Sequence, residues 1–260
     1  MIPMYTTIGE HCVELVCRSE RLLAGLKKSF RFSFSSSRKP DLFVQVNEGY
    51  GVPFVDDHVE ITKQGGVISY ARADYLLETE SDYVHSEISA YNELALKHAL
   101  MNLYSAYLIH HEWGLLLHSS CVVDRGRAVV FAGPSGAGKS TAARLSQPRE
   151  LLSDEATLVR ITPRKITVYD SPFRSELHGA PDQPVCPLSS IQLLKQSPIN
   201  LRNPISKPSA LLQLTDKVFY WAHDAEETRK AFSLLVTLTE AVPVYELFFQ
   251  KNDTFWELIS

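Results

Sequence analysis

The feature that most constrains this chain is a glycine-rich segment near its middle, Gly133–Thr141, which reads GPSGAGKST. It fits the pattern G-x-x-x-x-G-K-[ST] at every position. The apolar run AVVFA at residues 128–132 leads directly into it, and residues 141–145 can begin a helix that Pro148 ends. Strand, loop and helix in this order form the setting in which the motif holds phosphates, so the sequence predicts an α/β nucleotide-binding core.

Each residue type in the segment has a physical task. Glycines let the backbone adopt positive φ angles, so that successive N–H groups can converge on an anion. Lys139 supplies a charge to the β and γ phosphate oxygens, and the Ser140 hydroxyl is a ligand for the magnesium ion that bridges them. We therefore expect ATP and Mg²⁺ as cofactors. The residues assigned to nucleotide binding are Gly133, Ser135, Gly136, Ala137, Gly138, Lys139, Ser140 and Thr141.

An acidic pair follows the glycine-rich segment closely. Asp154 and Glu155 come directly after the short apolar stretch ELLS at residues 150–153, which predicts a short strand ending near the phosphate site. A carboxylate there can take a proton from a hydroxyl nucleophile or hold magnesium through a water molecule. The alternative is an acid that caps a turn.

The first 112 residues read as a strand-rich portion that ends in a long helix. Alternation predicts a strand over Ser29–Ser35 with Phe30, Phe32 and Phe34 on one face. Apolar residues recurring every three or four positions predict a helix from Glu87 to about Glu112. Further strands are expected at residues 42–46, 59–62 and 67–71, the last two joined by a hairpin at residues 64–66.

Residues 113–260 predict a second, mixed α/β portion. Asp224 followed by Glu227 has the spacing of a capping box and predicts a helix start. Helices and strands do not alternate regularly, which predicts a mixed sheet. Strands are expected at residues 115–118, 121–123, 127–132, 157–161, 166–169, 191–194 and 244–249, with a closing helical turn at residues 253–259. Arg125–Gly126 predicts a hairpin turn between the second and third of these strands.

Charge and composition exclude some classes of protein. Lys and Arg number 26 against 30 Asp and Glu, so the chain lacks the basic excess of a nucleic-acid-binding protein. No apolar run approaches membrane-spanning length, and the opening segment lacks a secretory signal, so we expect no membrane association. Four cysteines without metal-binding spacing indicate a cytoplasmic protein. The basic residues between Arg18 and Lys39 form either a solvated face or a docking surface for an acidic peptide or phosphate.

Three stretches together resemble the HPr kinase/phosphorylase superfamily. They are LLHSSCVV at residues 116–123, the loop GPSGAGKST, and LLSDE at residues 151–155. The resemblance covers residues 113 to about 180 well and continues weakly to the C-terminus. It implies a P-loop kinase core of the HPr kinase type over residues 113–260, with a mixed sheet, preceded by the strand-rich portion at residues 1–112.

The resemblance also implies catalytic roles. Asp154 would activate a serine hydroxyl, His118 would lie beside that acid and orient it, and Lys139 would act on the transferred phosphate. Glu155 stands where the superfamily has a second Asp, and with Ser140 and Asp154 it completes the expected metal ligands.

A later segment, residues 170–179, does not match the superfamily loop that is linked to phosphorolysis. The kinase activity that the resemblance implies is retained, whereas this segment gives no support for phosphorylase activity and leaves that activity open. Arg174 is a candidate contact for the γ-phosphate or the substrate, and Glu176 a candidate second metal ligand. For each of them the alternative is an ordinary surface salt bridge.

The leading hypothesis is an ATP- and magnesium-dependent kinase that phosphorylates a serine hydroxyl of a peptide or small protein. The resemblance extends to kinases of lasso-peptide precursors, which suggests a precursor peptide as partner, and the superfamily includes hexamers, which admits a homo-oligomer. One alternative is a kinase of free serine or another small alcohol. Another is a non-catalytic, nucleotide-binding regulatory module.

Overall fold

The computed structural model describes residues 3–177 and 184–260. The chain divides into two compact units, each of which is made of two separate segments of the sequence. The first unit comprises residues up to His111 together with Tyr220–Thr228. The second comprises Glu112–Phe219 and Arg229–Ser260. A short segment from the second half of the chain therefore belongs to the first unit.

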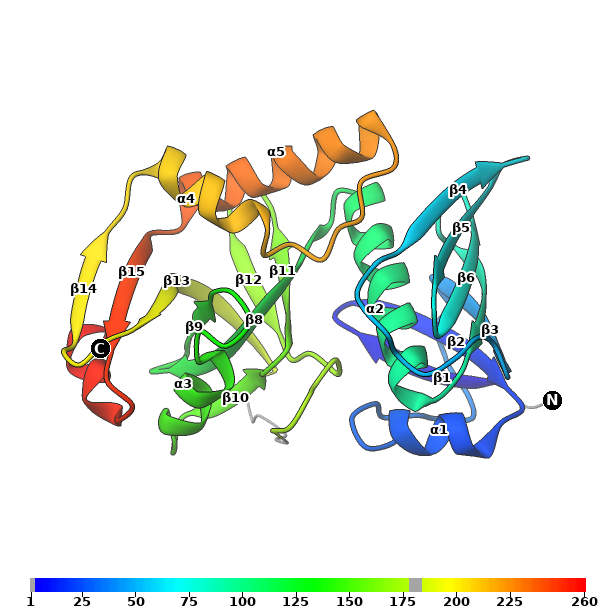
Figure 1. Cartoon of the computed structure of the whole chain (residues 1–260), viewed down its shortest axis with the longest axis horizontal. Coiled ribbons are helices and arrows are strands. Elements are labelled where there is room, and N and C mark those ends of the chain that lie inside the picture. The colour runs from blue at the N-terminus through cyan, green and yellow to red at the C-terminus, as the bar shows by residue number, and fades with distance from the viewer. Residues whose placement is uncertain (1–2, 178–183) are drawn as a thin grey trace. The chain divides into compact units, whose positions relative to one another are not determined.

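The first unit is built on a mixed sheet (Figure 1). Within the described part of the chain it has seven strands in the order β1-β2-β3-β7-β6-β5-β4. β3 runs parallel to both β2 and β7, and the other neighbours are antiparallel. The strands are β1 (Met4–Ile8), β2 (His11–Cys17), β3 (Leu42–Glu48), β4 (Glu60–Gln64), β5 (Val67–Arg72), β6 (Tyr75–Glu80) and β7 (His85–Ala90).

Helices α1 (Glu20–Leu26) and α2 (Glu93–His110) accompany this sheet. Helix α1 packs against helix α2, which in turn packs on β6 and β7. The side chain of Asn92 accepts a hydrogen bond from the backbone N–H of Ala95 and begins α2. The predicted hairpin at residues 64–66 is confirmed, because Gln64 and Val67 are paired across a two-residue turn.

Two sequence predictions for this unit are wrong. The segment 29–35 is not a strand; only Ser33 bridges to β1, at Tyr5, and Phe34 is 73% exposed while Phe30 is buried. The long helix does not begin at Glu87, because residues 85–90 form β7, in which exposed and buried positions alternate. Apolar residues within β7 continue the helical spacing of α2 by coincidence, so periodicity placed the boundary too early.

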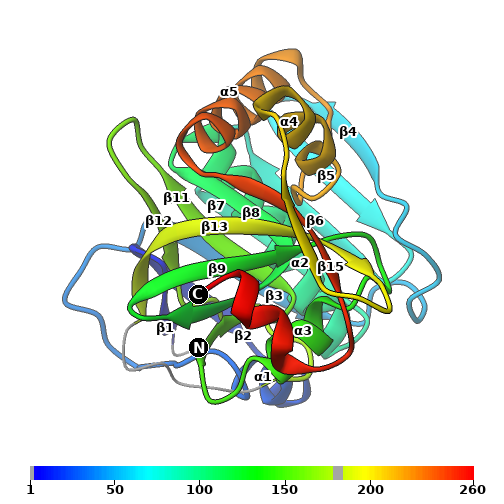
Figure 2. The same cartoon turned by 90° about the vertical axis from the view of Figure 1, so that its left-hand side faces the viewer.

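The second unit also contains a mixed sheet, which has eight strands among the residues described. β13 runs parallel to its neighbours β9 and β15 (Figure 2), and the remaining pairs are antiparallel. The strands are β8 (Gly114–Asp124), β9 (Arg127–Ala132), β10 (Glu150–Ser153), β11 (Ala156–Ile161), β12 (Ile166–Tyr169), β13 (Val185–Gln196), β14 (Leu201–Pro204) and β15 (Val244–Phe249). The expected mixed α/β organisation is confirmed.

Strand β8 is the structural centre of this unit. The sequence predicted two short strands here, but β8 runs unbroken because Ser119 and Ser120, which interrupt the apolar pattern, are buried and hydrogen-bonded. Its second half pairs with β9 and β10, and its first half pairs with β11. The hairpin predicted at Arg125–Gly126 is confirmed by the pairing of Asp124 with Arg127.

The helices of the second unit are short except for α5. They are α3 (Lys139–Leu145), α4 (Lys207–Thr215), α5 (Ala225–Ala241), whose first residues belong to the first unit, and the 3₁₀ helix η1 (Asp253–Leu258). Phe255 and Trp256 of η1 pack with Phe131, Ala142 and Phe249 in one buried cluster beneath α3. Of the helices described, none is long and apolar enough to cross a membrane.

Candidate functional site

The glycine-rich loop connects the buried strand β9 to helix α3. Gly136 and Gly138 have φ angles of +77° and +102°, in the region that side chains disfavour. A Cβ on Gly138 would lie 2.8 Å from Cζ of Phe249, so that position is closed to any larger residue. The backbone therefore has the glycine-dependent turns that the motif predicts, between a strand and a helix.

Lys139 is buried at the first position of α3. Its Nζ donates to the backbone oxygens of Gly133 and Pro134, each at 3.1 Å. Burial lowers the pKa of the ammonium, and the charge of Lys217 lowers it further. The ammonium thus rests on neutral carbonyls of the loop itself, and an anion that replaced them would form stronger, charge-assisted hydrogen bonds.

Asp154 is only 2% exposed and is engaged with the backbone. Its Oδ1 accepts from the N–H of Ser175 at 2.9 Å, and its Oδ2 accepts from Glu176 and Leu177 at 2.8 Å each. The carboxylate therefore organises the turn at residues 175–177. A carboxylate has about four acceptor sites and these bonds occupy three of them, so one site on Oδ1 remains for a substrate proton. The catalytic role of Asp154 stays a prediction.

Strand β8 brings several of the predicted residues to one place. His118 lies opposite Ala156, and the N–H of Ser119 donates to the carbonyl of Glu155 at 3.1 Å. One residue further along, the Ser120 hydroxyl donates to the carbonyl of Lys139 at 2.8 Å. The corner that carries the acidic pair and the first turn of α3 are therefore both attached to the same stretch of β8.

Arg174 and Glu176 each form a salt bridge, but only that of Glu176 is the surface pair expected as the alternative. Arg174 is buried, pairs with Asp170 and donates to the backbone oxygens of Leu151 and Leu152. Glu176 lies at the surface, 2.9 Å from Arg144. Their proposed contacts with phosphate, substrate or metal stay predictions, and residues 178 and 179 of the same segment lie outside the described residues.

One charged residue beside the loop was missed by the sequence reasoning. Lys217 is only 8% exposed, and its carbonyl accepts the N–H of His118 at 2.7 Å. Its Nζ lies 2.5 Å from Oδ2 of Asp216. No motif marks this lysine, because only the pairing of residues 217–219 with β8 brings it toward the loop.

A pocket of about 360 Å³ opens next to the loop. Gly138 and Thr141 form one wall, Gln196–Pro198 another, and Phe249 and Lys251 complete it. The Gln196 amide donates to the carbonyl of Gly136 at 2.8 Å, which ties the pocket wall to the loop. The volume is in the range of small-molecule sites, and the pocket combines an aromatic ring with a cation.

The expected magnesium site can be tested against the donors present. Magnesium takes one or two protein oxygens and otherwise phosphate and water oxygens. Ser140 offers a hydroxyl directly after Lys139, and Glu155 lies at the corner held by β8, whereas Asp154 is occupied by amides. Among the residues described, no group of three or more His, Cys, Asp or Glu could hold a metal by itself. The donors therefore suit an ion that is held mainly by a nucleotide.

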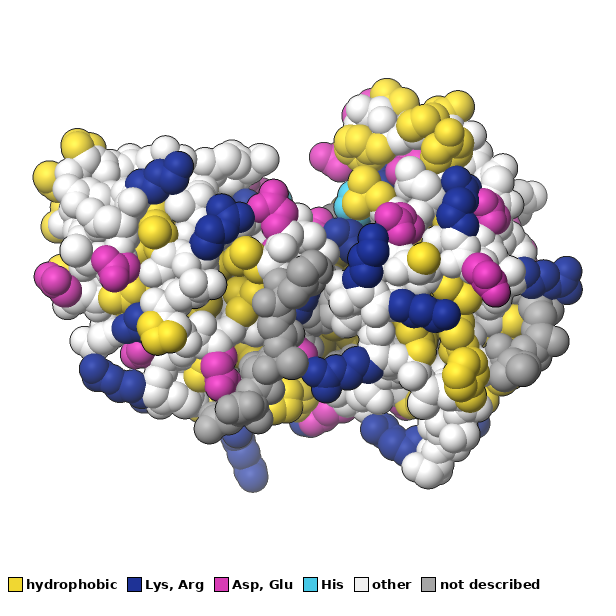
Figure 3. All heavy atoms as spheres, turned by 90° about the horizontal axis from the view of Figure 1, so that it is seen from below, with side chains coloured by type: hydrophobic (Ala, Val, Ile, Leu, Met, Phe, Trp, Pro, Cys, Tyr) yellow, Lys and Arg dark blue, Asp and Glu magenta, His cyan; other side chains and the backbone are white. Residues whose placement is uncertain are grey.

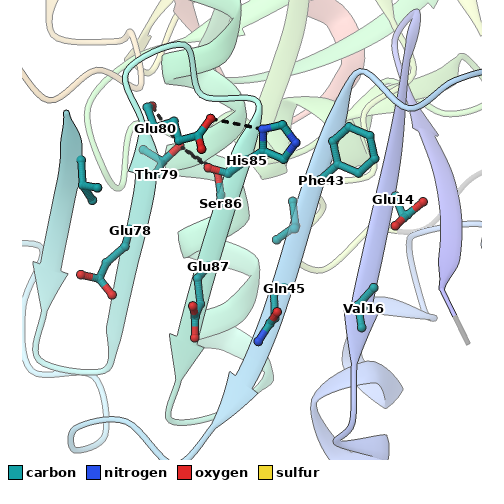
Figure 4. Close-up of a pocket in the computed structure, with 12 residues that line it drawn as sticks. Glu14, Val16, Phe43, Gln45, Glu78, Thr79, Glu80, His85, Ser86 and Glu87 are labelled. Carbon is teal, nitrogen blue, oxygen red and sulfur yellow. Dashed lines mark hydrogen bonds and ion pairs between the residues drawn. The ribbon is translucent and has the colours of Figure 1, made fainter. Parts of the chain in front are cut away.

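A second hollow, of about 540 Å³, lies on the sheet of the first unit (Figure 4) and contains none of the predicted site residues. Side chains from neighbouring strands line it, and His85 stacks on Phe43 and pairs with Glu80 at 3.2 Å. Its other acidic side chains are Glu14, Glu78 and Glu87.

On the molecular face in Figure 3, basic and acidic side chains are interspersed and do not form one patch of a single sign.

Comparisons with known proteins place the chain in a family. No curated protein matches it. Among solved structures, the HPr(Ser) kinase/phosphatase from Coxiella burnetii is similar to 55% of this chain over 90% of its own length, at 11% identity and a TM-score of 0.30. The family model described as "SynChlorMet cassette protein ScmC" matches residues 85–260, which is more than half of the chain. The chain therefore belongs to the ScmC family.

Proposed function

We propose that this protein binds ATP at the glycine-rich loop and transfers a phosphoryl group to a serine hydroxyl of a peptide or small protein. The observation that carries the proposal is the loop itself. A buried strand leads into two glycines with positive φ, and the loop closes on a buried lysine whose Nζ donates to the backbone carbonyls of Gly133 and Pro134 in the same loop. We propose that this loop is a P-loop within a kinase core of the HPr kinase type.

The residues of the second unit would divide the work as follows. Lys139 would leave the carbonyls of Gly133 and Pro134 and bind phosphate oxygens, while the loop amides surround the anion. The pocket formed by Phe249, Lys251 and their neighbours would take the nucleoside. Magnesium bound to the phosphates would neutralise charge that develops during transfer. Ser140 and Glu155 would hold it, and His118 would position the acidic corner of β10.

A specific observation also favours a second candidate. Both oxygens of Asp154 accept backbone N–H groups, as expected of an acid that shapes a turn and takes no part in proton transfer. A nucleotide-binding regulatory module without transfer activity would need nothing more from this residue. The two candidates share the phosphate site and differ only in whether a product is formed.

The test measures binding and transfer separately. The protein is incubated with ATP, Mg²⁺ and either a serine-containing precursor peptide or free serine, and an added phosphate is sought by mass. Nucleotide binding is followed in parallel with a fluorescent ATP analogue. We expect phosphopeptide from the wild-type protein, and loss of binding in Lys139→Ala because the buried cation is removed.

Asp154→Asn tests whether Asp154 is the base in the transfer reaction. The amide keeps one acceptor but turns an NH₂ group toward backbone donors, which costs about 1–3 kcal/mol of stability. Thermal unfolding is therefore measured alongside. If Asp154 is the base, the folded variant binds nucleotide and forms no product. Transfer by Asp154→Asn at the wild-type rate would assign Asp154 to the turn alone. Nucleotide binding by the wild-type protein without product from any hydroxyl would support the regulatory module. No nucleotide binding by the wild-type protein would refute both candidates.

A further inference from the structure

The segment that contains Lys217 pairs with β8 directly beyond the end of strand β9. In the register of the β8–β9 pair, Ala132 lies opposite Ser119, and the chain then leaves the sheet to form the glycine-rich loop. The next positions along β8 are taken by another segment: the carbonyl of Lys217 accepts the N–H of His118, and Val218 lies opposite Leu117. Lys217 thus occupies the place beside β8 that Gly133 would hold if β9 continued.

This position sets two buried lysines within electrostatic reach of one another. Lys139 and Lys217 are each 8% exposed, and the charge of Lys217 acts on Lys139. Like charges in a buried environment destabilise one another, and burial of each adds to the cost. The Asp216 carboxylate compensates part of this, at 2.5 Å from Nζ of Lys217, yet its own side chain is 71% exposed. An anion between the lysines would remove the rest of the cost.

We propose that Lys217 is the second cation of the phosphate site, binding a phosphate oxygen of the nucleotide together with Lys139. In the absence of nucleotide, Asp216 neutralises Lys217. When the phosphates enter, the exposed carboxylate turns into solvent and the ammonium transfers to the phosphate. The proposal rests on the proposed nucleotide site and adds a residue that the sequence motif does not contain.

The experiment compares four variants of the full chain in titrations with a fluorescent ATP analogue and in competition with inorganic tripolyphosphate. Lys217→Gln removes the cation, and we expect both affinities to fall by about tenfold or more, as for loss of a charged hydrogen bond. Lys217→Arg keeps the charge and should retain most of the affinity. Lys165→Gln removes an exposed lysine from a turn of the same unit and should leave both affinities unchanged.

The direction in which Asp216→Asn changes the affinity for both probes decides the proposal. Removing the competing carboxylate should tighten binding of both probes by about two- to fivefold, the range of an exposed ion pair. A purely structural role for Lys217 predicts no gain, so unchanged or weaker binding in this variant would overturn the proposal even if Lys217→Gln failed to fold. Wild-type affinity in folded Lys217→Gln would also overturn it while leaving the nucleotide site intact. A wild-type protein that binds neither probe would refute the nucleotide site and this proposal together.

Discussion

At the scale of single residues, the loop shows how conformation and space constrain a glycine separately. Gly136 and Gly138 both have positive φ angles. Among the described residues other than its two chain neighbours, none has an atom within 4 Å of a Cβ placed on Gly136, whereas on Gly138 that atom would meet the ring of Phe249 at 2.8 Å. The first glycine is required only for its backbone conformation, and the second is required for conformation and space.

The pair gives a graded prediction. Gly136→Ala should cost about 1–2 kcal/mol through strain alone, and its nucleotide affinity should fall only modestly. Gly138→Ala adds the clash with Phe249, so it should lose more stability and bind the fluorescent ATP analogue far more weakly. Thermal unfolding and titration measure both. Equal effects of the two substitutions would contradict the steric argument.

In the first unit, His11 couples stability to pH. Its Nδ1 lies 2.8 Å from the Tyr104 hydroxyl, and burial lowers the pKa of the imidazole below its usual 6.5, with Asp41 partly opposing the shift. Between the lowered pKa and 6.5, the unfolded chain binds a proton that the folded chain excludes. The free energy of unfolding should therefore fall as pH is lowered below 6.5, and stop falling below the folded pKa.

Denaturant unfolding at several pH values measures this dependence. His11→Asn removes the titrating group and should flatten the curve between pH 6.5 and the lowered pKa, whatever it does to the overall stability. His58→Asn, which alters an exposed histidine of the same unit, serves as the control and should leave the slope as it is. An unchanged slope in His11→Asn would show that other groups determine the acid sensitivity.

At the scale of elements, the C-terminal 3₁₀ helix η1 packs against helix α3, which follows the glycine-rich loop. The Trp256 indole Nε1 donates to the Ser146 hydroxyl at 3.0 Å, at the end of α3, and the Arg149 guanidinium lies 3.7 Å from its ring centroid. The Trp256 and Phe131 ring centroids are 5.9 Å apart in an edge-on arrangement. Helix α3 has only seven residues, so its position depends on this packing more than on its own hydrogen bonds.

Trp256→Ala should therefore lower the free energy of unfolding of the second unit by about 3–5 kcal/mol. Because α3 carries Lys139, nucleotide affinity should fall as well. Leu258→Ala alters a 40% exposed residue of the same helix and should change neither quantity by much. Denaturant titration with and without nucleotide makes the comparison. Wild-type nucleotide affinity in a destabilised Trp256→Ala would show that the position of α3 does not depend on η1.

At the scale of the whole molecule, the chain passes between its two units more than once. Residues 220–228 belong to the first unit although both flanking segments belong to the second. The Tyr83 hydroxyl lies 3.1 Å from Nε2 of His223, His110 pairs with Glu227 at 2.8 Å, and Lys63 lies 3.7 Å from Asp224. Asp224 also accepts from the N–H groups of Glu226 and Glu227, so the helix start that the sequence predicted there is confirmed.

This connectivity predicts the behaviour of a chain cut between residues 111 and 112. After cleavage at a protease site introduced there, the two pieces should elute together in size-exclusion chromatography, because residues 220–228 remain docked in the first unit. A cleaved chain that also carries His223→Ala and Glu227→Ala should separate more readily. Complete separation of the otherwise unaltered pieces would contradict the contacts of this segment.

The sequence alone determined the features whose causes lie within a few residues of one another. The glycine-rich loop, the turns at residues 64–66 and 125–126, and the helix start at Asp224 follow from backbone preferences and local hydrogen bonds. The strands predicted at residues 42–46, 67–71, 127–132, 166–169 and 244–249 likewise correspond to β3, β5, β9, β12 and β15. The mixed sheet followed from the irregular order of these local elements.

The partners that distant residues meet depend on how the whole chain folds. The engagement of Asp154 depends on a turn at residues 175–177, and the burial of Lys217 depends on a segment that pairs with β8. The residues at 85–90 became a strand because β3 and β6 flank them, although their spacing suits a helix. In each case the deciding hydrogen bonds join positions far apart in the chain, and no local pattern records them.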